Sequence, residues 1–280
     1  NTAVTSEAYV SPGMPSLKET DSAVSFFEFW PTWLMYMPVV FSWLILSLRH
    51  LSLSLPLIAN PRIPNSGMVG FSKNDVLIQG DEHSQKYILP WITYTVTDHP
   101  LDQQVDLIMS RLAESGLKLP IVGKPDMGCR GAGVNLLNDK NDVTNYLRHY
   151  SIGGVFMLQR LADWEPEAGI FYVKLPDENT GRITSIALKY TPYVLGDGEK
   201  TLSELIKADP RAGRVTHLYE NRHKSLMDQI IPRDEPFRLV FAASHCRGAV
   251  FTDGRIYITD ALSQKIDEIM SGFPEFYYGR

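Results

Sequence analysis

A lysine followed by a glycine-rich loop is the best candidate for an anion-binding site in this sequence. Residues 119–134 begin as an apolar run with β character, place Lys124 at the end of that run and break at Pro125. Three glycines follow within six positions, namely Gly128, Gly131 and Gly133. Because such a loop carries few β-carbons, its backbone N–H groups can turn onto an anion, and Lys124 and Arg130 add positive charge. These features indicate a phosphate-binding loop; the alternative is a glycine-rich hairpin that joins two strands.

Two common nucleotide-binding motifs do not fit this loop. A P-loop needs Gly-Lys-Ser/Thr at its end, and a dinucleotide fingerprint needs Gly-x-Gly-x-x-Gly. The run Lys124-Pro125-Asp126-x-Gly128-x-Arg130-Gly131-x-Gly133-Val134 instead resembles the phosphate loop of the ATP-grasp ligases, in particular the D-alanine–D-alanine ligase and cyanophycin synthetase branches. The resemblance covers roughly residues 70–280 and includes several motifs in the same order.

The resemblance implies which residues would hold the phosphates of ATP. The loop residues would be Lys124, Gly128, Arg130, Gly131 and Gly133. Lys73, which follows the helix-capping Ser72, corresponds to the family's lysine that reaches the α- and β-phosphates. A surface lysine is the alternative for Lys73.

The resemblance also implies which residues would bind the nucleoside. Gln159, Arg160 and Leu161 fall at the hinge that meets the adenine, where the family usually has Glu-Lys-x-Leu. Glutamine can still pair with the Watson–Crick edge of adenine, and an edge strand with polar ends is the alternative. Glu167 matches the family's ribose-binding glutamate, whose carboxylate can accept hydrogen bonds from two adjacent hydroxyls.

Three further residues would take part in catalysis. Lys189 matches a family lysine near the terminal phosphate, Arg247 could bind a substrate carboxylate or the γ-phosphate, and Arg280 matches the arginine that stabilises negative charge on the acyl oxygen. His245 is a candidate for orientation or proton transfer. For Lys189, Arg247 and His245 a structural or solvated role is the alternative, and Cys246 is interpreted as a small core residue.

A second family motif is interpreted as structural. Gly196-Asp197-Gly198 predicts a turn, and Thr201-x-x-Glu204 predicts a capping box at a helix start. The cyanophycin synthetase-like enzymes carry this motif followed by Asp-Pro-Arg-x-Gly, which recurs here at residues 209–213. No chemistry is assigned to Asp197.

As a whole, the resemblance implies an α+β fold of the ATP-grasp type, in which two lobes with antiparallel sheets close on ATP. It implies a carboxylate–amine ligase: γ-phosphoryl transfer makes an acyl phosphate, which an amine then attacks. The acid and amine would be amino-acid or peptide-like small molecules. Two alternatives stay open, namely a membrane-associated nucleotide-binding regulator with a decayed active site and an ATP-grasp kinase.

Magnesium is expected with ATP, because it neutralises phosphate charge through oxygen ligands. Asp126, Asp253 and Asp260 do not offer a plausible ligand pair, so no metal-binding residue is assigned. The family places an acidic residue and a Glu-x-Asn just after the Gly-Arg strand. We therefore expect the parent sequence to continue past Arg280 with these ligands, and we expect this fragment not to turn over ATP.

The elements that position these residues follow from local patterns. Helices are expected from Ser72, from Asp98 to Gly116, from Asp139 to His149 and over 261–271. Strands are expected at the following ranges: 51–58, 87–96, 154–161, 170–175, 183–190, 237–243, 248–251 and 255–258. Asp177–Gly181 and Thr252–Gly254 are expected to be hairpin turns.

The N-terminal part of the chain is expected to lie apart from the ATP-grasp domain, which is assigned to 69–280. Residues 1–25 predict a polar tail, and residues 26–68 an apolar segment with a linker. Residues 29–48 carry no charge and are long enough for a bilayer. We therefore expect association with a membrane and, from Arg49, a cytoplasmic catalytic domain. The alternatives are an interfacial segment and, from Pro31 and Pro38, a buried hairpin.

Composition narrows the class of protein. The chain has 280 residues, 44% of them hydrophobic, which is enough for one large or two modest cores. A formal net charge of −5 argues against a sequence-independent nucleic-acid binder. The two cysteines, Cys129 and Cys246, are too few for a disulfide framework and lack the clustering of a zinc site. They indicate a reducing compartment.

Overall fold

A computed structural model describes residues 9–17, 31–68, 70–128 and 131–279. Cys129, Arg130 and Arg280 therefore lie outside the described residues. The chain divides into two compact units, each assembled from separate stretches of sequence. The first unit comprises Asn1–Val40, Trp164–Gly169 and Ala187–Gly254, and the second comprises Phe41–Asp163, Ile170–Ile186 and Arg255–Arg280.

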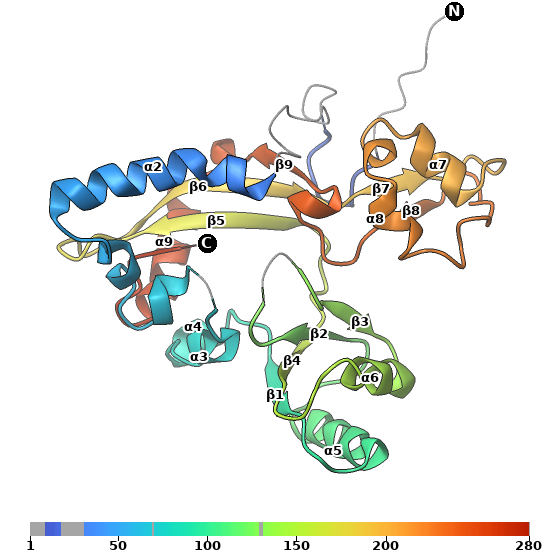
Figure 1. The fold of residues 1–280 in the computed structure, drawn as a ribbon, viewed down its shortest axis with the longest axis horizontal. Helices are drawn as coiled ribbons and strands as arrows, with labels where there is room; N and C mark the ends of the chain where they lie inside the picture. Colours follow the sequence, from blue (N-terminus) through green and yellow to red (C-terminus); the bar gives the residue numbers. More distant parts are fainter. Residues whose placement is uncertain (1–8, 18–30, 69, 129–130, 280) are drawn as a thin grey trace, which may run out of the picture. The chain divides into compact units, whose positions relative to one another are not determined.

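The second unit contains a four-stranded sheet with the order β1-β4-β2-β3. Its strands are β1 (Trp91–Thr95), β2 (Ile121–Pro125), β3 (Asn135–Leu137) and β4 (Val155–Arg160). β4 lies between β1 and β2 and is antiparallel to both (Figure 1). In the register of β2 and β4, Lys124 lies opposite Met157 and Ile121 lies opposite Arg160. The loop that follows Lys124 and the hinge that follows Arg160 therefore leave this strand pair at opposite ends.

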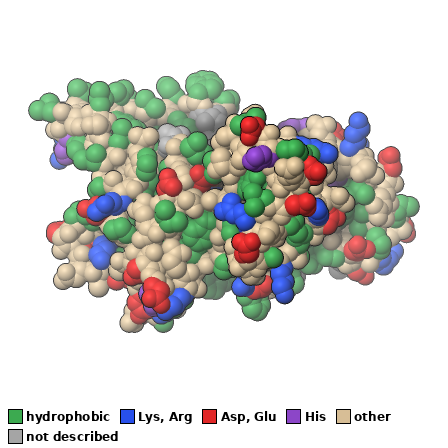
Figure 2. Space-filling model, turned by 90° about the horizontal axis from the view of Figure 1, so that it is seen from below, with side chains coloured by type: hydrophobic (Ala, Val, Ile, Leu, Met, Phe, Trp, Pro, Cys, Tyr) green, Lys and Arg blue, Asp and Glu red, His purple; other side chains and the backbone are tan. Residues whose placement is uncertain are grey.

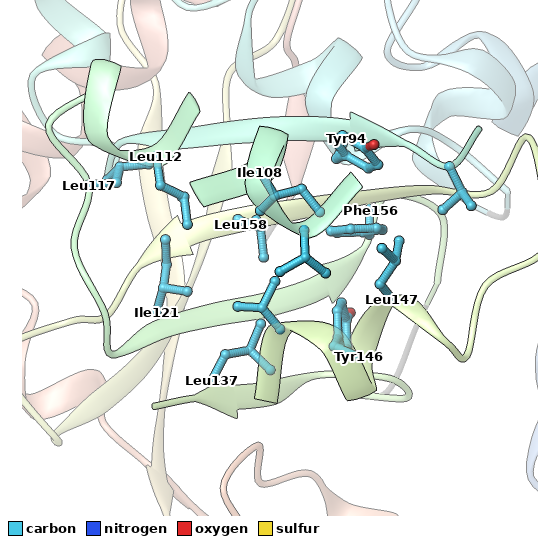
Figure 3. Packing of buried hydrophobic residues seen from close by; sticks show 13 residues of the cluster. Tyr94, Ile108, Leu112, Leu117, Ile121, Leu137, Tyr146, Leu147, Phe156 and Leu158 are labelled. Atoms are coloured by element: carbon cyan, nitrogen blue, oxygen red, sulfur yellow. The ribbon is translucent and has the colours of Figure 1, made fainter. Parts of the chain in front are cut away.

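Two helices, α5 (Leu101–Glu114) and α6 (Lys140–Leu147), cover one face of this sheet, and Figure 3 shows the core between them. α5 directs apolar residues at helical spacing inward, with Val105, Ile108 and Leu112 all buried. α6 is preceded by Asp139, whose side chain caps the helix by accepting from the backbone N–H of Asp142. Burial of this apolar face holds the sheet rigidly, and the strand that carries Lys124 is part of it.

Further described elements of the second unit are one longer helix, α9 (Asp260–Ser271), and several short elements. The short elements are η1 (Leu55–Ile58), η2 (Pro64–Gly67), α3 (Lys73–Leu77), α4 (Glu82–Gln85), η5 (Arg255–Tyr257) and β10 (Tyr278–Gly279). Ser72 caps α3, as the sequence predicts, and Thr259 caps α9. α9 packs on α4, where the Ser84 hydroxyl donates to the Ile269 carbonyl at 2.6 Å.

Two long strands, β5 (Glu167–Val173) and β6 (Arg182–Tyr190), each contribute residues to both units. The sheet they belong to has the order β10-β5-β6-β9, with β9 at Val250–Asp253. In the second unit β10 is antiparallel to β5, and in the first unit β9 is antiparallel to β6. The fold is thus a mixture of helices and antiparallel sheets, in agreement with the sequence.

The first unit also holds a small sheet and several helical turns around its own core. The elements are β7 (Tyr193–Leu195), α7 (Leu202–Ala208), η3 (Ala212–Arg214), α8 (His217–Glu220), β8 (Pro236–Arg238) and η4 (His245–Arg247). Leu202, Ile206, Tyr219 and Leu239 are fully buried in this core. Thr201 and Glu204 form the capping box that the sequence predicts at the start of α7. In the described part of the N-terminal stretch, the Tyr9 ring contacts the Tyr193 ring edge-on.

Several predicted strands of the second unit are absent or shorter in the structure. Residues 51–58 form a turn and the 3-10 helix η1, because Pro56 has no N–H for a strand ladder. Residues 87 and 88 continue helical turns after α4, and their N–H groups donate to the carbonyls of Ser84 and Gln85. Strand β1 therefore begins only at Trp91. Residues 255–257 form the 3-10 helix η5 in place of the second strand of the expected hairpin.

Two further boundaries differ for reasons that involve side chains. β8 ends at Arg238, whose guanidinium donates to the carbonyls of Val240 and Phe241 and bends the chain away from the strand. α5 begins after Pro100 and not at Asp98. The buried Gln104 amide satisfies the backbone of Thr97 and His99 there, so the helix start does not depend on the Asp98 side chain.

The apolar segment predicted to enter a membrane forms a single helix, α2 (Thr32–His50), with Pro38 inside it. It is not the buried hairpin considered as an alternative, since large side chains such as Phe41 and Leu48 are exposed. Among the helices of the described ranges, none is long and apolar enough to cross a membrane. The expected membrane span is therefore not found.

Candidate functional site

The end of β2 holds a partly buried lysine beside an uncharged partner. The Lys124 ammonium donates to Oε1 of Gln159 at 2.6 Å, and the Gln159 amide nitrogen donates to the Leu89 carbonyl at 2.7 Å. Within the described ranges no carboxylate forms an ion pair with Lys124. Burial, and then the positive charge of Lys73, lower the pKa of Lys124. The site thus carries a desolvated positive charge that no described acidic residue neutralises.

Lys73 is the first residue of α3, and its side chain contacts the backbone at the end of β2 and in the loop that follows. Its ammonium donates to the carbonyls of Pro125 at 2.9 Å, Asp126 at 2.9 Å and Gly128 at 3.1 Å. The Lys73 backbone N–H also donates to the Asp126 carbonyl. Because Ser72 caps α3, the first turn of that helix holds the Lys73 side chain toward the loop. In this structure Lys73 therefore positions the start of the glycine loop, a contact that its sequence motif does not predict.

Asp126 joins the same loop to α3. Its carboxylate accepts a hydrogen bond from the Asn74 backbone N–H at 2.9 Å, and its side chain is buried. Asn74 in turn accepts from the Trp91 indole N–H at 3.0 Å, which links this turn to β1. Asp126 thus has a structural partner at a helix N-terminus, where a carboxylate is favoured by the helix dipole.

The far end of the loop is held by a tyrosine from α6. The Tyr146 hydroxyl donates to the Gly133 carbonyl at 2.9 Å and forms a second hydrogen bond with the Tyr150 hydroxyl at 2.7 Å. The Tyr146 ring lies against Gly123, where an added β-carbon would meet it at 2.9 Å. Gly133 has φ +71° and lies against Pro125, so a side chain there would be both strained and crowded. These contacts explain why β2 and the loop need glycine at two of their positions.

The residues expected to meet adenine lie at the other end of β2. Arg160 and Leu161 line a pocket of about 470 Å³ together with residues 116–120. The Arg160 guanidinium pairs with Asp163 at 2.5 Å, and its backbone N–H donates to the Pro90 carbonyl. From Ile121 to Lys124 the strand rises about 10 Å, so the hinge pocket and the loop are roughly one nucleotide length apart.

The first unit brings two predicted residues together. The Lys189 ammonium and the Glu167 carboxylate form an ion pair at 2.7 Å, in which the lysine side chain is 14% exposed and the glutamate 60%. Glu167 opens β5 and Lys189 lies near the end of β6. In this structure the expected ribose ligand and the expected phosphate ligand therefore neutralise one another.

Arg247 and His245 lie on η4 in the first unit. The His245 ring stacks on Phe251 with 4.1 Å between centroids, and the Tyr219 hydroxyl donates to the Arg247 carbonyl at 3.2 Å. Partial burial, and then the charge of Arg247, lower the pKa of Arg222. Arg222 was not singled out from the sequence, because no motif marks it and its proximity to Arg247 comes from the packing of α8 on η4. The Cys246 side chain is not described.

The second strong sequence motif has a structural role. The Asp197 carboxylate accepts from the N–H groups of Glu199 and Lys200 and pairs with the Lys200 ammonium at 2.7 Å. Asp209 accepts from the N–H groups of Arg211 and Ala212, and the Arg211 guanidinium donates to the carbonyls of Gly248 and Ala249. These are turn and cap contacts, which agrees with assigning no chemistry to Asp197.

Within the described residues, no group of three or more His, Cys, Asp or Glu side chains could hold a metal ion. Asp126 already binds the N-terminus of α3, and Asp260 lies in the first turn of α9.

Sequence reasoning missed the contacts of Leu89 and Tyr146 and the hydrogen bond between Gln159 and Lys124. In this structure the Gln159 amide oxygen accepts from Lys124 and its amide nitrogen donates to the Leu89 carbonyl, while its expected contact with adenine stays a prediction. The register places Gln159 on β4 opposite Val122 on the neighbouring strand β2. Gln159 is therefore two positions from Lys124 along the strand pair. A correct alignment of the two strands would have indicated this contact.

Comparisons with known proteins give distant likenesses only. No family model matches the chain, and no curated protein matches it. Among solved structures, a bifunctional glutathione synthetase from Pasteurella multocida is 14% identical over 76% of this chain and 30% of its own, with a TM-score of 0.27. The VanG D-Ala:D-Ser ligase from Enterococcus faecalis is 8% identical over 71% of this chain and 45% of its own, with a TM-score of 0.36.

A third similar structure is the D-alanine-D-alanine ligase from Helicobacter pylori, at 10% identity over 71% of this chain and 62% of its own, with a TM-score of 0.29. This chain thus spans less than two thirds of the length of each of these proteins. With TM-scores below 0.5, these are likenesses from which no function follows, and the chain's own geometry carries the proposal below.

Proposed function

We propose that this chain is the nucleotide-binding part of an ATP-dependent carboxylate–amine ligase of the ATP-grasp type. The observation that carries the proposal is the presence of two positive charges where a glycine-rich loop begins: Lys124 lies near the end of the strand that leads into the loop, and the Lys73 ammonium contacts the first carbonyls of the loop. Both ammonium groups belong to the second unit, and their positive charges attract a polyanion. No described carboxylate neutralises the charge of Lys124. Such a site favours a triphosphate over a singly charged ligand.

The proposed pose places the triphosphate over the loop after β2 and the base near Arg160 and Leu161. Loop amides at Gly128, Gly131 and Gly133 would face the phosphates, since these residues add no side chain in the way. The hinge pocket supports this direction of binding, because it lies at the opposite end of β2. The role of Glu167 at the ribose stays a prediction from the sequence, and in the structure its carboxylate forms an ion pair with Lys189.

The proposed reaction has two steps. An oxygen of the substrate carboxylate attacks the γ-phosphorus of ATP, the bond to the bridging oxygen breaks, and ADP leaves. An amine then attacks the carbonyl carbon of the acyl phosphate, loses a proton and expels inorganic phosphate. Within the second unit, Lys124 and Lys73 would contribute positive charge at the phosphates. The roles of Lys189 at the transferred group and of Arg247 and Arg280 at the substrate stay predictions from the sequence. Mg²⁺ use stays a prediction, because the described residues supply no cluster of ligands.

The test is release of ADP by the protein that contains this chain. Candidate amino acids and short peptides are supplied with ATP, with and without hydroxylamine as a general amine. A ligase gives ADP only in the presence of a suitable carboxylate, and hydroxylamine converts the acyl phosphate to a hydroxamate that is measured by mass. Phosphorylation of a hydroxyl with no need for an amine would point to a kinase. ATP binding without any acceptor-dependent ADP would point to a regulator, and either outcome would overturn the ligase proposal.

A further inference from the structure

A pocket of about 320 Å³ lies in the second unit, beside the strand pair β5 and β10. Among the residues that line it are Phe171 and Val173 on β5, Tyr277 and Tyr278 at the start of β10, and Ala59 after η1. The protein surface that faces this β5–β10 pocket is almost wholly apolar. The pocket can therefore bury an apolar group, and it offers little to a charged one.

Lys174 also borders the pocket, but its charge is directed elsewhere. Side chains alternate between the two faces of a strand, so Tyr172 and Lys174 point away from the face that carries Phe171 and Val173. Tyr172 contacts α9 through its hydroxyl, and the Lys174 ammonium lies 3.5 Å from the hydroxyl of Ser271, which is also on α9. The positive charge of Lys174 therefore belongs to the opposite face of the sheet, and the pocket suits a neutral group.

The wall that β10 contributes is fixed by a buried side chain. Asn60 is 3% exposed, and its amide oxygen accepts from the backbone N–H groups of Tyr277 at 2.8 Å and Tyr278 at 3.2 Å. Its amide nitrogen donates to the Tyr278 carbonyl at 2.8 Å, and the Lys174 N–H donates to the Tyr277 carbonyl at 2.7 Å. Because these contacts already hold the wall in place, little ordering is needed when a ligand binds.

The size and the shape of the pocket indicate which apolar group fits. Its volume of about 320 Å³ is at the lower end of the range of ~300–1,000 Å³ for small-molecule pockets, so one side chain suits it better than a long acyl chain. The rings of Phe171 and Tyr278, whose centroids are 6.2 Å apart, add flat apolar surfaces. A branched aliphatic or an aromatic side chain would pack well against them.

The position of the pocket in the sequence connects it with the substrate. Tyr277 and Tyr278 belong to the segment Tyr277-Tyr278-Gly279-Arg280, and the sequence resemblance predicts that Arg280 acts on the acyl oxygen of the substrate. We propose that the β5–β10 pocket binds the side chain of an apolar amino-acid substrate, of the size of leucine or phenylalanine, and selects it against small and charged amino acids. This inference rests on the proposed function and gives the chemical class of one of its substrates.

The experiment is calorimetric titration of the purified protein that contains this chain. The protein is titrated first with ATP and then, in the presence of a non-hydrolysable ATP analogue, with amino acids. The amino acids are leucine, phenylalanine, alanine and glutamate, each in the L and the D form. Decanoate is added as a long-chain probe, because a lipid-binding pocket would prefer it.

Three variants change the pocket in different ways. Val173→Asp places a charge in it, Val173→Thr adds a hydroxyl at nearly constant shape, and Phe171→Ala enlarges it. Ile256→Asp is the matched control, since Ile256 is 83% exposed on η5. Thermal unfolding shows which variants are folded, and Val173→Thr gives the answer if Val173→Asp is not.

We expect the wild type to bind leucine and phenylalanine on the order of tenfold more tightly than alanine or glutamate, because more apolar surface is buried. Val173→Asp should weaken leucine binding on the order of tenfold and Val173→Thr by roughly several-fold, because a polar group in the pocket loses its water. Ile256→Asp should leave leucine affinity nearly unchanged. Phe171→Ala should raise the ratio of phenylalanine to leucine affinity, whereas a merely structural role for Phe171 would leave this ratio unchanged.

The remaining outcomes separate this inference from the proposed function. Binding of ATP with no preference for leucine and phenylalanine, or tighter binding of decanoate than of both, would overturn the inference and leave the proposed function intact. Equal losses of leucine affinity in Val173→Asp and Ile256→Asp, or an unchanged ratio in Phe171→Ala, would do the same. If the protein binds leucine but neither ATP nor its analogue, the proposed function is wrong, and the assignment of the pocket to a substrate is wrong with it.

Discussion

The partly buried ammonium of Lys124 is unfavourable for folding. Moving an ammonium out of water is unfavourable unless a hydrogen bond or an opposite charge compensates. Gln159 supplies the hydrogen bond and no charge, and Lys73 adds a like charge nearby. The lowered pKa of Lys124 records that cost. A bound polyanion would relieve it, and this is the physical link between the residue and its proposed role.

The first prediction concerns the pH dependence of binding at Lys124. Because burial and Lys73 lower its pKa from 10.5, Lys124 should lose its proton before ordinary lysines as the pH rises. Above about pH 8 the γ-phosphate of ATP is already ionised, so affinity for ATP should fall as Lys124 deprotonates. Lys124→Met should weaken ATP binding by about 2–4 kcal/mol at neutral pH and remove this phase. Calorimetric titrations across the alkaline range measure both.

The lowered pKa of Lys124 also determines how this residue makes the free energy of unfolding depend on pH. Between the lowered pKa and 10.5 the unfolded chain binds more protons at Lys124 than the folded chain, so this residue makes the free energy of unfolding rise with pH in that window. Lys207→Met, at an exposed lysine of α7, is the control and should change neither profile. Equal ATP affinity in wild type and Lys124→Met would contradict the assignment of Lys124 to the phosphates.

At the scale of elements, the glycine loop is held from both sides by secondary structure. The first turn of α3 brings Lys73 and Asn74 to its start, and α6 brings Tyr146 to Gly133. A loop anchored at both ends loses less conformational entropy when it binds a ligand. α7 provides the contrast, since its Thr201–Glu204 capping box stabilises a helix start and touches no proposed ligand.

The second prediction separates stability from binding at α7. Thr201→Ala should lower the free energy of unfolding by about 1 kcal/mol, because the N–H of Glu204 loses its cap, and should leave ATP affinity unchanged. Thr216→Ala is the matched control, since Thr216 is the N-cap of α8 but makes no side-chain capping hydrogen bond. Denaturant unfolding measures both variants. An equal loss of unfolding free energy in Thr201→Ala and Thr216→Ala would contradict a stabilising role for the Thr201 cap. A change in ATP affinity for Thr201→Ala would contradict a purely structural motif.

At the scale of the whole molecule the net charge is negative, and the positive charge at Lys73 and Lys124 is a local feature. The formal net charge is −5, and Lys and Arg side chains are interspersed with Asp and Glu on the described part of the face shown in Figure 2. Phosphate binding would therefore depend on short-range contacts at Lys73 and Lys124, because the long-range field does not attract polyanions.

The third prediction follows from that charge distribution. The chain should not bind duplex DNA or RNA at physiological salt, because its formal net charge is −5 and non-specific binding to a nucleic-acid backbone depends on the release of counterions by many basic side chains. ATP and tripolyphosphate should bind under the same conditions. An electrophoretic mobility-shift assay with duplex DNA, run beside calorimetry with tripolyphosphate, measures the difference. A retarded DNA band at low protein concentration would contradict it.

The sequence by itself determined the elements that depend on neighbouring residues. Ser72, Asp139 and Thr201 cap helices whose partners lie three residues away, so their patterns are readable without tertiary structure. The strand into Lys124 and the turn at its glycines follow from the same short-range chemistry. The mixture of helices and antiparallel sheets was predicted as well, through a resemblance that depends on such motifs in order.

Only the tertiary structure shows which residues distant in sequence form hydrogen bonds with Lys73 and Lys124. Gln159 lies 35 residues from Lys124, and the loop carbonyls that hold Lys73 are more than 50 residues away, so no local pattern encodes either contact. Residues 255–257 carry strand-like composition but fold as a 3-10 turn, and residues 29–48 carry a membrane-like composition that does not produce a membrane-crossing helix among the described residues. The composition of a segment limits the secondary structures that it can adopt. Which of these structures forms depends on the surfaces of the rest of the chain against which the segment packs.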